Sequence, residues 1–224
     1  MNVYCVLKTG GCYNEEYVKR LYKNIKNNTT KLDAFICLTD NPEIKFCETV
    51  ELKHNWPGWW SKIELFREDL PHLPSVYFDL DTLILGNIDE LMSIPEEYGT
   101  FHVLRGFNQN RSGMKNNENF ASGIMCGNFY EYSEVYNKFK DGVEKYKSIK
   151  YNDWRNGDQG FIADVLQDKG VGRIQNKLWD DYIVGKRYIM RNKITKQTRV
   201  IAWSGEPRIH TLKYNQFDGI SKYW

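Results

Sequence analysis

The chain has 224 residues, of which 27% are charged and 15% aromatic, and its formal net charge is +2. A chain of this length forms one large domain or two small ones and can bury a hydrophobic core. The near balance of acids and bases argues against a protein that binds nucleic acid non-specifically. No apolar run approaches the length of about 20 residues that a membrane-spanning helix requires, so we expect no membrane span.

The cysteines are odd in number, scattered along the chain, and free of C-x-x-C pairs: Cys5, Cys12, Cys37, Cys47 and Cys126. Dispersed thiols of this kind are typical of a protein from a reducing compartment and not of a disulfide framework. We therefore expect a soluble, cytoplasmic protein.

The first forty residues have the pattern of a strand, a helix and a second strand. Residues 3–7 form an apolar run that is broken by Thr9-Gly10-Gly11, and residues 34–38 form another. Asn14 is placed to cap a helix whose apolar side chains recur at helical spacing. This order predicts a βαβ unit with a parallel pair of strands.

A third strand, at residues 46–52, is followed by an aromatic loop at 54–60. Ser61 and Glu64 have the spacing of a capping box, which predicts that a helix begins there. Lys62 would then lie in the first turn, where free N–H groups already favour an anion. The lysine is explained either by a bound anion or as an ordinary surface residue.

The segment from Ser75 to Gly86 contains two acids, Asp79 and Asp81, directly after an apolar strand. Along an extended backbone both side chains would point the same way. Two such carboxylates suit a hard ion such as magnesium or manganese, which shares its coordination with substrate phosphates. The alternative is a strand end whose acids face water, but acids after a buried strand lie where α/β proteins bind ligands.

In the second half we predict strands at residues 100–104, 120–126 and 199–203, and a helix at 133–148 that is interrupted by Gly142. The polar stretch 107–119 is predicted to be a loop that closes over a ligand as a lid. Asp158 is predicted to be the N-cap of a further helix that ends at Gly170.

The segment Tyr77 to Leu85 resembles the metal-binding D-x-D strand of GT-A glycosyltransferases, especially the glycogenin and bacterial galactosyltransferase group called family 8. The resemblance implies a single Rossmann-like α/β domain over residues 1–213, with a mixed, mostly parallel central sheet flanked by helices. Residues 214–224 would be a C-terminal tail that leads to further domains. The chain as a whole also resembles glycosyltransferase domains of large algal viruses, which would place it in a host cytoplasm.

Two more segments carry the resemblance. Asp158-Gln159, before a helix, is similar to the pair that holds the donor sugar beside its anomeric carbon. Ser204 to His210 is similar to a C-terminal glycine–basic–histidine element, although Ile209 replaces the usual proline and Ala202 stands where family 8 has its histidine. The residues implied are, for metal binding, Asp79, Asp81 and His210; for donor binding, Lys8, Thr9, Tyr13, Lys62, Asp79, Ser122 and Arg208; and for catalysis, Asp158 and Gln159.

The implied activity is transfer of a hexose or deoxyhexose from a UDP-sugar to a glycan or glycoprotein acceptor, dependent on Mn²⁺ or Mg²⁺ and with retention of configuration. Two alternatives stay open. Phe78 to Asp81 also resembles the haloacid-dehalogenase phosphatases, in which Asp79 would be a nucleophile, although Leu83 stands where that family has Thr or Val. The aromatic content also fits a sugar-binding module without catalytic activity.

Overall fold

The structure is a computed structural model that describes residues 1–107, 120–150, 157–190 and 194–211. The expected lid, from residue 108 onward, and the expected tail at 214–224 lie outside the described residues.

The predicted βαβ unit is confirmed. Strand β1 (Asn2–Leu7), helix α1 (Glu15–Asn27) and strand β2 (Ala34–Thr39) follow one another, and β1 pairs with β2 in parallel. Asn14 caps α1 as expected, because its side-chain oxygen accepts a hydrogen bond from the backbone N–H of Glu16 at 3.2 Å. Side chains of β1 are buried toward both faces of the sheet, which is typical of a parallel strand covered on both sides.

The central sheet has seven strands in the order β3-β2-β1-β4-β7-β6-β8. Strand β7 runs antiparallel to both of its neighbours, and the other pairs are parallel, so the expected mixed, mostly parallel sheet is confirmed. The further strands of this sheet are β3 (Glu48–Glu51), β4 (Ser75–Phe78), β6 (His102–Arg105), β7 (Phe120–Gly127) and β8 (Gly172–Arg173). A second, three-stranded sheet contains β5 (Thr82–Ile84), β10 (Val200–Ala202) and β9 (Ile183–Gly185).

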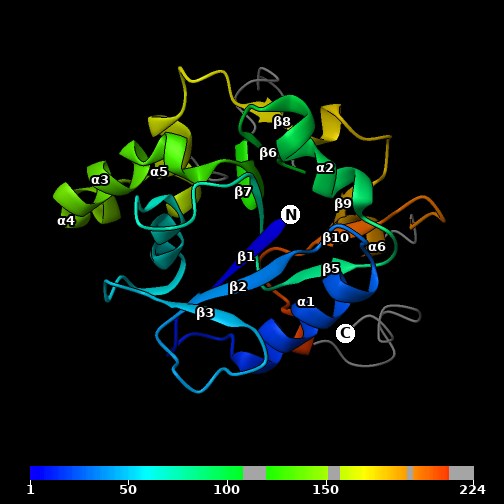
Figure 1. The fold of residues 1–224 in the computed structure, drawn as a ribbon, viewed down its shortest axis with the longest axis horizontal. Helices are drawn as coiled ribbons and strands as arrows, with labels where there is room; N and C mark the ends of the chain where they lie inside the picture. Colours follow the sequence, from blue (N-terminus) through cyan, green and yellow to red (C-terminus); the bar gives the residue numbers. More distant parts are fainter. Residues whose placement is uncertain (108–119, 151–156, 191–193, 212–224) are drawn as a thin grey trace.

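Helices cover both faces of the central sheet (Figure 1). On one face lie α1, α2 (Asp89–Tyr98) and the three-stranded sheet, and they share a core with Val3, Cys5 and Leu7 of β1. On the other face, Tyr4 and Val6 join a core with the 3₁₀-helix η1 and with α3 and α5. The elements on this second face are η1 (Gly58–Phe66), η3 (Phe129–Tyr132), α3 (Glu134–Asp141), α4 (Val143–Ser148) and α5 (Asp158–Val165). Short turns of helix complete the chain: η4 (Ile174–Asn176), α6 (Lys186–Met190) and η5 (Ile209–Thr211).

Two helices end at a glycine. The break at Gly142 is confirmed, because α3 ends and α4 begins there. Helix α2 continues through Pro95 to Tyr98. Its true stop signal is Gly99, which adopts the left-handed conformation that glycine accommodates at helix ends.

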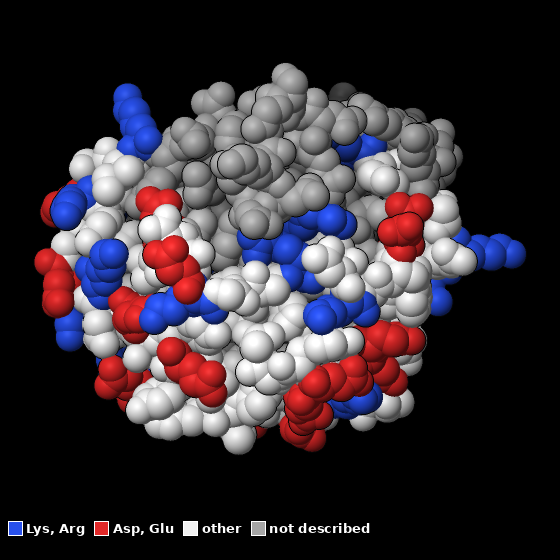
Figure 2. Space-filling model, turned by 90° about the horizontal axis from the view of Figure 1, so that it is seen from above, with Lys and Arg blue, Asp and Glu red and all other residues white. Residues whose placement is uncertain are grey.

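Acidic and basic side chains are interspersed over the described part of the face shown in Figure 2. All five cysteines are free thiols, and three of them, Cys5, Cys37 and Cys126, are buried. Within the described ranges, no helix combines the length and the apolar character needed to cross a bilayer.

Candidate active site

Asp79 and Asp81 lie in a tight turn that joins the central sheet to the second sheet. The N–H of Thr82 donates to the carbonyl of Asp79 at 3.1 Å, which closes the turn. Our reasoning from an extended backbone was therefore wrong, because the strand ends at Phe78 and both acids lie in the turn before β5. The two carboxylates are nevertheless close enough for the charge of Asp79 to raise the pKa of Asp81.

Asp81 is a buried carboxylate with incomplete charge compensation. It is 5% exposed, and its Oδ2 accepts a hydrogen bond from the Tyr13 hydroxyl at 2.6 Å. Arg208 Nη1 lies 3.3 Å from the same oxygen and also donates to the Tyr13 hydroxyl. Burial and the charge of Asp79 raise the pKa of Asp81 to about 6, against the opposing effects of Tyr13, Arg208 and Lys62. A second cation near this carboxylate would thus be stabilising.

Lys62 joins two carboxylates that are far apart in the sequence. Its Nζ lies 2.9 Å from Asp79 Oδ1 and 2.9 Å from Asp158 Oδ2, and the residue is only 7% exposed. Burial alone would lower the pKa of Lys62, but the charges of Asp158 and Asp79 outweigh that effect and raise it. The anions beside this lysine are therefore two carboxylates of the chain itself.

The predicted capping box at Ser61 and Glu64 is wrong. Helix η1 begins at Gly58, and the Ser61 hydroxyl donates to the Gly58 carbonyl at 2.7 Å. Glu64 is buried and accepts instead from the N–H groups of Lys53 and His54 and from Arg67. Lys62 consequently lies in the middle of a helix and not in its first turn.

Asp158 is the first residue of α5, and Gly157 is its N-cap, so the predicted capping role of Asp158 is also wrong. The carboxylate turns toward the sheet, where it pairs with Lys62 and accepts from the Ser122 hydroxyl at 2.9 Å. Burial raises the pKa of Asp158, while Lys62 opposes this shift. The neighbouring Gln159 accepts from the Ser122 N–H through Oε1 at 3.3 Å. The structure thus brings Lys62, Asp79, Ser122, Asp158 and Gln159 together.

An irregularity in β7 creates this junction. The register between β6 and β7 shifts between Val103, which pairs with Met125, and Leu104, which pairs with Ala121. The intervening Gly123 offers its carbonyl to the Asp79 N–H at 2.8 Å. A Cβ at Gly123 would lie 3.3 Å from Asp79 Oδ2, so glycine permits the close approach. Bulges of this kind are frequent beside active sites.

Lys8 and Thr9 follow β1, at the edge of the sheet where the chain of β2 also ends. Both bind Asp40, which accepts from the Thr9 N–H and hydroxyl at 2.8 Å each and forms an ion pair with Lys8. Burial opposes ionisation of Asp40, but these contacts lower its pKa. The sequence analysis missed Asp40, although the ends of two neighbouring parallel strands necessarily meet at one edge.

Tyr77 was missed as well. Its hydroxyl donates to Asp79 Oδ1, and the Lys62 ammonium group lies 5.4 Å from the centre of its ring. The sequence carried no local signal for this contact, because β4 ends at Phe78 and Asp79 already belongs to the turn.

His210 contacts α1. Its Nδ1 forms a hydrogen bond with the Tyr17 hydroxyl, and the residue is exposed. Among the described residues, no three His, Cys, Asp or Glu side chains are gathered as a metal site. A role of His210 as the third metal ligand stays a prediction.

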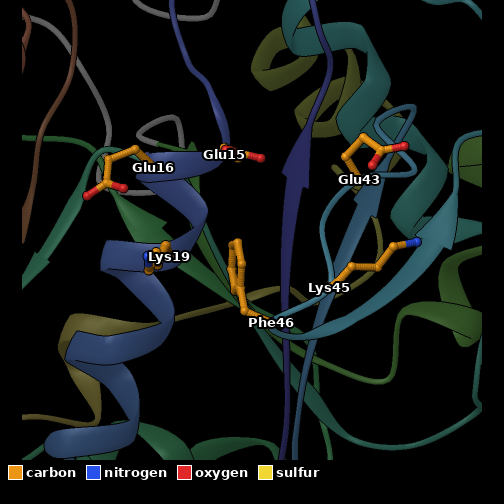
Figure 3. A pocket seen from close by; sticks show the side chains of 6 residues that line it. All are labelled: Glu15, Glu16, Lys19, Glu43, Lys45 and Phe46. Carbon is orange, nitrogen blue, oxygen red and sulfur yellow. The ribbon is translucent and has the colours of Figure 1, made fainter.

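A separate shallow pocket of about 400 Å³ lies between α1 and the segment after β2 (Figure 3). Its lining contains none of the predicted site residues: Glu15, Glu16, Lys19, Glu43, Lys45 and Phe46. We assign it no part in the site.

No protein-family profile matches the sequence, and no curated protein matches it. Solved structures do match. The galactosyltransferase LgtC, in complex with donor and acceptor sugar analogues, matches with a TM-score of 0.66 and 12% identity, over 100% of this chain and 94% of LgtC. The fold is that of GT-A glycosyltransferases.

Two further GT-A structures are similar over most of this chain. The glycosyltransferase GlyE of Streptococcus pneumoniae matches with a TM-score of 0.67 and 11% identity, over 96% of this chain and 56% of GlyE. The bifunctional glycosyltransferase WbbM matches with a TM-score of 0.57 and 16% identity, over 92% of this chain and 46% of WbbM. The chain thus spans about half the length of GlyE and of WbbM. At these identities the likeness establishes the fold.

Proposed function

We propose that this protein is a metal-dependent glycosyltransferase that transfers a hexose or deoxyhexose from a UDP-sugar to a glycan or glycoprotein acceptor. One observation carries the proposal: Lys62, Asp79, Asp81 and Asp158 converge at one edge of the central sheet. LgtC, GlyE and WbbM, which share the fold, are glycosyltransferases, and this favours glycosyl transfer over the phosphatase and over a module without catalytic activity.

The donor would lie along the edge formed by β1, β2 and β4. The loop with Lys8 and Thr9, held by Asp40, would receive the base and ribose together with Tyr13. The Arg208 guanidinium is suited to the diphosphate, because it can donate two parallel hydrogen bonds to phosphate oxygens. In the present structure it pairs with Asp81 and would have to turn from that carboxylate toward the diphosphate.

The residues at the turn fit a divalent cation. Within the described part of the chain, Asp79, Asp81 and Asp158 share only Lys62 and Arg208 as basic partners, so when all are ionised the group is one positive charge short, and the pKa of Asp81 is raised. Carboxylate oxygens are the ligands that Mn²⁺ and Mg²⁺ favour. Asp79 and Asp81 would hold the ion, with His210 as the proposed third ligand. When bound, the ion would neutralise charge on the departing diphosphate.

Asp158 and Gln159 would hold the donor sugar next to its anomeric carbon, with Lys62 keeping Asp158 ionised and in place. An inverting enzyme needs a carboxylate base for the acceptor hydroxyl. Among the described residues of the site, Asp79 and Asp158 pair with Lys62 and Asp81 pairs with Arg208. This pairing supports retention of configuration, which proton NMR of the glycoside product tests directly.

Calorimetry tests the proposal as a whole. UDP-glucose and UDP-galactose are titrated into the wild type and into Asp81→Ala, with manganese and with EDTA. We expect binding of at least one donor by the wild type in manganese, and its loss both in EDTA and in the variant. Equal affinities in manganese and in EDTA would contradict metal dependence, and no binding of any UDP-sugar would contradict the proposed donor.

A further inference from the structure

Trp59 is unusual for its exposure. It is 59% exposed, more than any other large hydrophobic side chain in the described part of the chain. Tryptophan is highly buried on average, so an indole left in water at the edge of a site is a candidate contact surface. The next residue, Trp60, is instead buried and packs in the hydrophobic core.

The helix that carries Trp59 places it in line with the buried lysine. Helix η1 is a 3₁₀-helix, in which side chains three residues apart lie directly above one another. Trp59 and Lys62 therefore share one side of η1, about 6 Å apart along its axis. Lys62 is buried and reaches Asp79 and Asp158, whereas Trp59 lies one turn nearer the start of η1 and is exposed.

Gly157 fixes the indole beside the start of α5. A Cβ at Gly157 would lie 2.1 Å from Trp59 Nε1, so the ring edge lies directly on this backbone. Gly157 has a φ of 63°, in the region that favours glycine, and immediately precedes Asp158. The indole is thus held next to the proposed catalytic residue.

We propose that Trp59 is the platform on which a pyranose ring of the acceptor stacks. This inference rests on the proposed glycosyltransferase function and names the acceptor subsite. A pyranose has an apolar face of C–H groups, which matches the flat face of an exposed indole, and a rim of hydroxyls, which neighbouring polar groups can bind. Binding sites for small ligands combine such apolar walls with a few placed polar groups.

The position of Trp59 favours the acceptor over the donor. Tyr13 and Arg208, which meet at Asp81, lie on the side of the site toward α1. Helix η1 covers the opposite face of the sheet from α1 (Figure 1). With the diphosphate at Arg208 and the donor sugar at Asp158, the acceptor would approach from the remaining side, on which Trp59 is exposed.

The test compares the wild type with Trp59→Ala, Trp59→Phe and the control Tyr130→Ala. Tyr130 is another exposed aromatic residue, 39% exposed, whose ring stacks on His72, a residue outside the proposed site. Two rates are measured with UDP-glucose and UDP-galactose. The first is transfer to methyl β-D-glucopyranoside and methyl β-D-galactopyranoside, and the second is donor hydrolysis in water without acceptor.

We expect Trp59→Ala to raise the KM for the methyl glycoside about tenfold or more, an effect typical of losing an aromatic anchor. Donor hydrolysis and its KM should stay unchanged, Trp59→Phe should recover most of the loss, and Tyr130→Ala should behave as the wild type. Hydrolysis that falls as far as transfer would assign Trp59 to the donor sugar and overturn the inference. An unchanged acceptor KM would overturn it as well. Absence of donor binding in the wild type would instead reject the proposed function, and the platform with it.

Discussion

Lys62 Nζ lies 2.9 Å from Asp158 Oδ2, and both side chains are almost excluded from water. The pair connects η1 to α5 beneath the D-x-D turn, where Lys62 also meets Asp79. An ion pair in such a place stabilises little by itself, but removal of one partner leaves the other charge buried and unpaired. Lys62 is therefore expected to matter for stability as well as for the donor.

Lys62→Met should lower the free energy of unfolding by about 3–5 kcal/mol, the range for breaking a buried ion pair. The control is Lys147→Met, which removes a surface pair with Glu144 and should cost at most about 1 kcal/mol. Urea denaturation monitored by tryptophan fluorescence measures both. The double variant Lys62→Met/Asp158→Asn should recover part of the loss. Equal losses of unfolding free energy in Lys62→Met and Lys147→Met would show that the buried pair contributes no more to stability than the surface pair.

Asp158→Asn should lower kcat about a hundredfold, since it removes a charge placed beside the proposed anomeric carbon. UDP affinity should stay within about twofold, because UDP lacks the sugar. Steady-state kinetics and calorimetry separate the two quantities. Asp164→Asn, on the exposed side of the same helix, is the matched control and should retain wild-type kinetics. Near-normal turnover of Asp158→Asn would remove Asp158 from the catalytic group.

Arg208→Ala should weaken UDP binding about ten- to a hundredfold, the range for losing hydrogen bonds to a charged group. Uridine binding should change much less, because uridine has no diphosphate. Calorimetry with both ligands decides this, and Arg187→Ala, an exposed arginine on α6, controls for overall charge. Equal losses for UDP and uridine would place Arg208 away from the diphosphate.

The stability of the protein should depend on pH, because the folded state disfavours the ionised form of Asp81. Burial and the charge of Asp79 raise its pKa to about 6. The Asp81 carboxyl therefore contributes fully to stability below about pH 4, which is its pKa in the unfolded chain. This contribution is lost as the pH rises through 6, the pKa in the folded protein. In EDTA at pH 7.5, Asp81→Asn should unfold at a higher urea concentration than the wild type. Its free energy of unfolding should be greater by at most about 3 kcal/mol.

At pH 4 the difference between Asp81→Asn and the wild type should disappear. Asp180→Asn, an exposed aspartate, is the control and should show no such crossover. Manganese should stabilise the wild type at pH 7.5 and not Asp81→Asn. A variant that is less stable than the wild type at pH 7.5 in EDTA would show that the Asp81 carboxylate is fully compensated by Arg208.

Gly157→Ala should destabilise the fold and disturb Trp59, because its new Cβ would overlap the indole. Gly10→Ala is a matched control, since Gly10 also has a positive φ but nothing lies within 4 Å of its added Cβ. Backbone strain should cost Gly10→Ala about 1–3 kcal/mol, and more in Gly157→Ala, because the φ of 63° and ψ of −136° at Gly157 are adopted readily by glycine alone. A shift of tryptophan emission in Gly157→Ala that Gly10→Ala lacks reports the contact with Trp59. Equal losses and unchanged emission in both variants would place the indole elsewhere.

Much of the architecture could be predicted from local pattern. The strand-helix-strand start, the cap at Asn14 and the break at Gly142 rest on short-range rules that the structure confirms. The acidic pair was also recognisable, although the reason was wrong. An apolar run does not reveal where a strand stops, so the turn that closes between Asp79 and Thr82 could not be anticipated.

The side chains around Lys62 show what local rules miss. Ser61 and Glu64 have the spacing of a capping box, but η1 begins earlier, at Gly58. Both residues therefore lie inside the helix, one turn of three residues apart. Asp158 looks like a cap because the alternative partner, Lys62, lies far away in the sequence. Such pairings depend on tertiary contacts, which override local preference.

Strand β10 and the segment to His210 complete the site from late in the chain. Strand β10 pairs with β5, directly after the D-x-D turn, and Arg208 provides the guanidinium at Asp81. These residues lie more than a hundred positions after Asp81 in the sequence, so the ribosome synthesises them much later. During synthesis, Asp81 therefore has no contact with Arg208 until the segment that follows β10 has left the ribosome. Nascent chains should acquire nucleotide binding late, in one step with the docking of this segment.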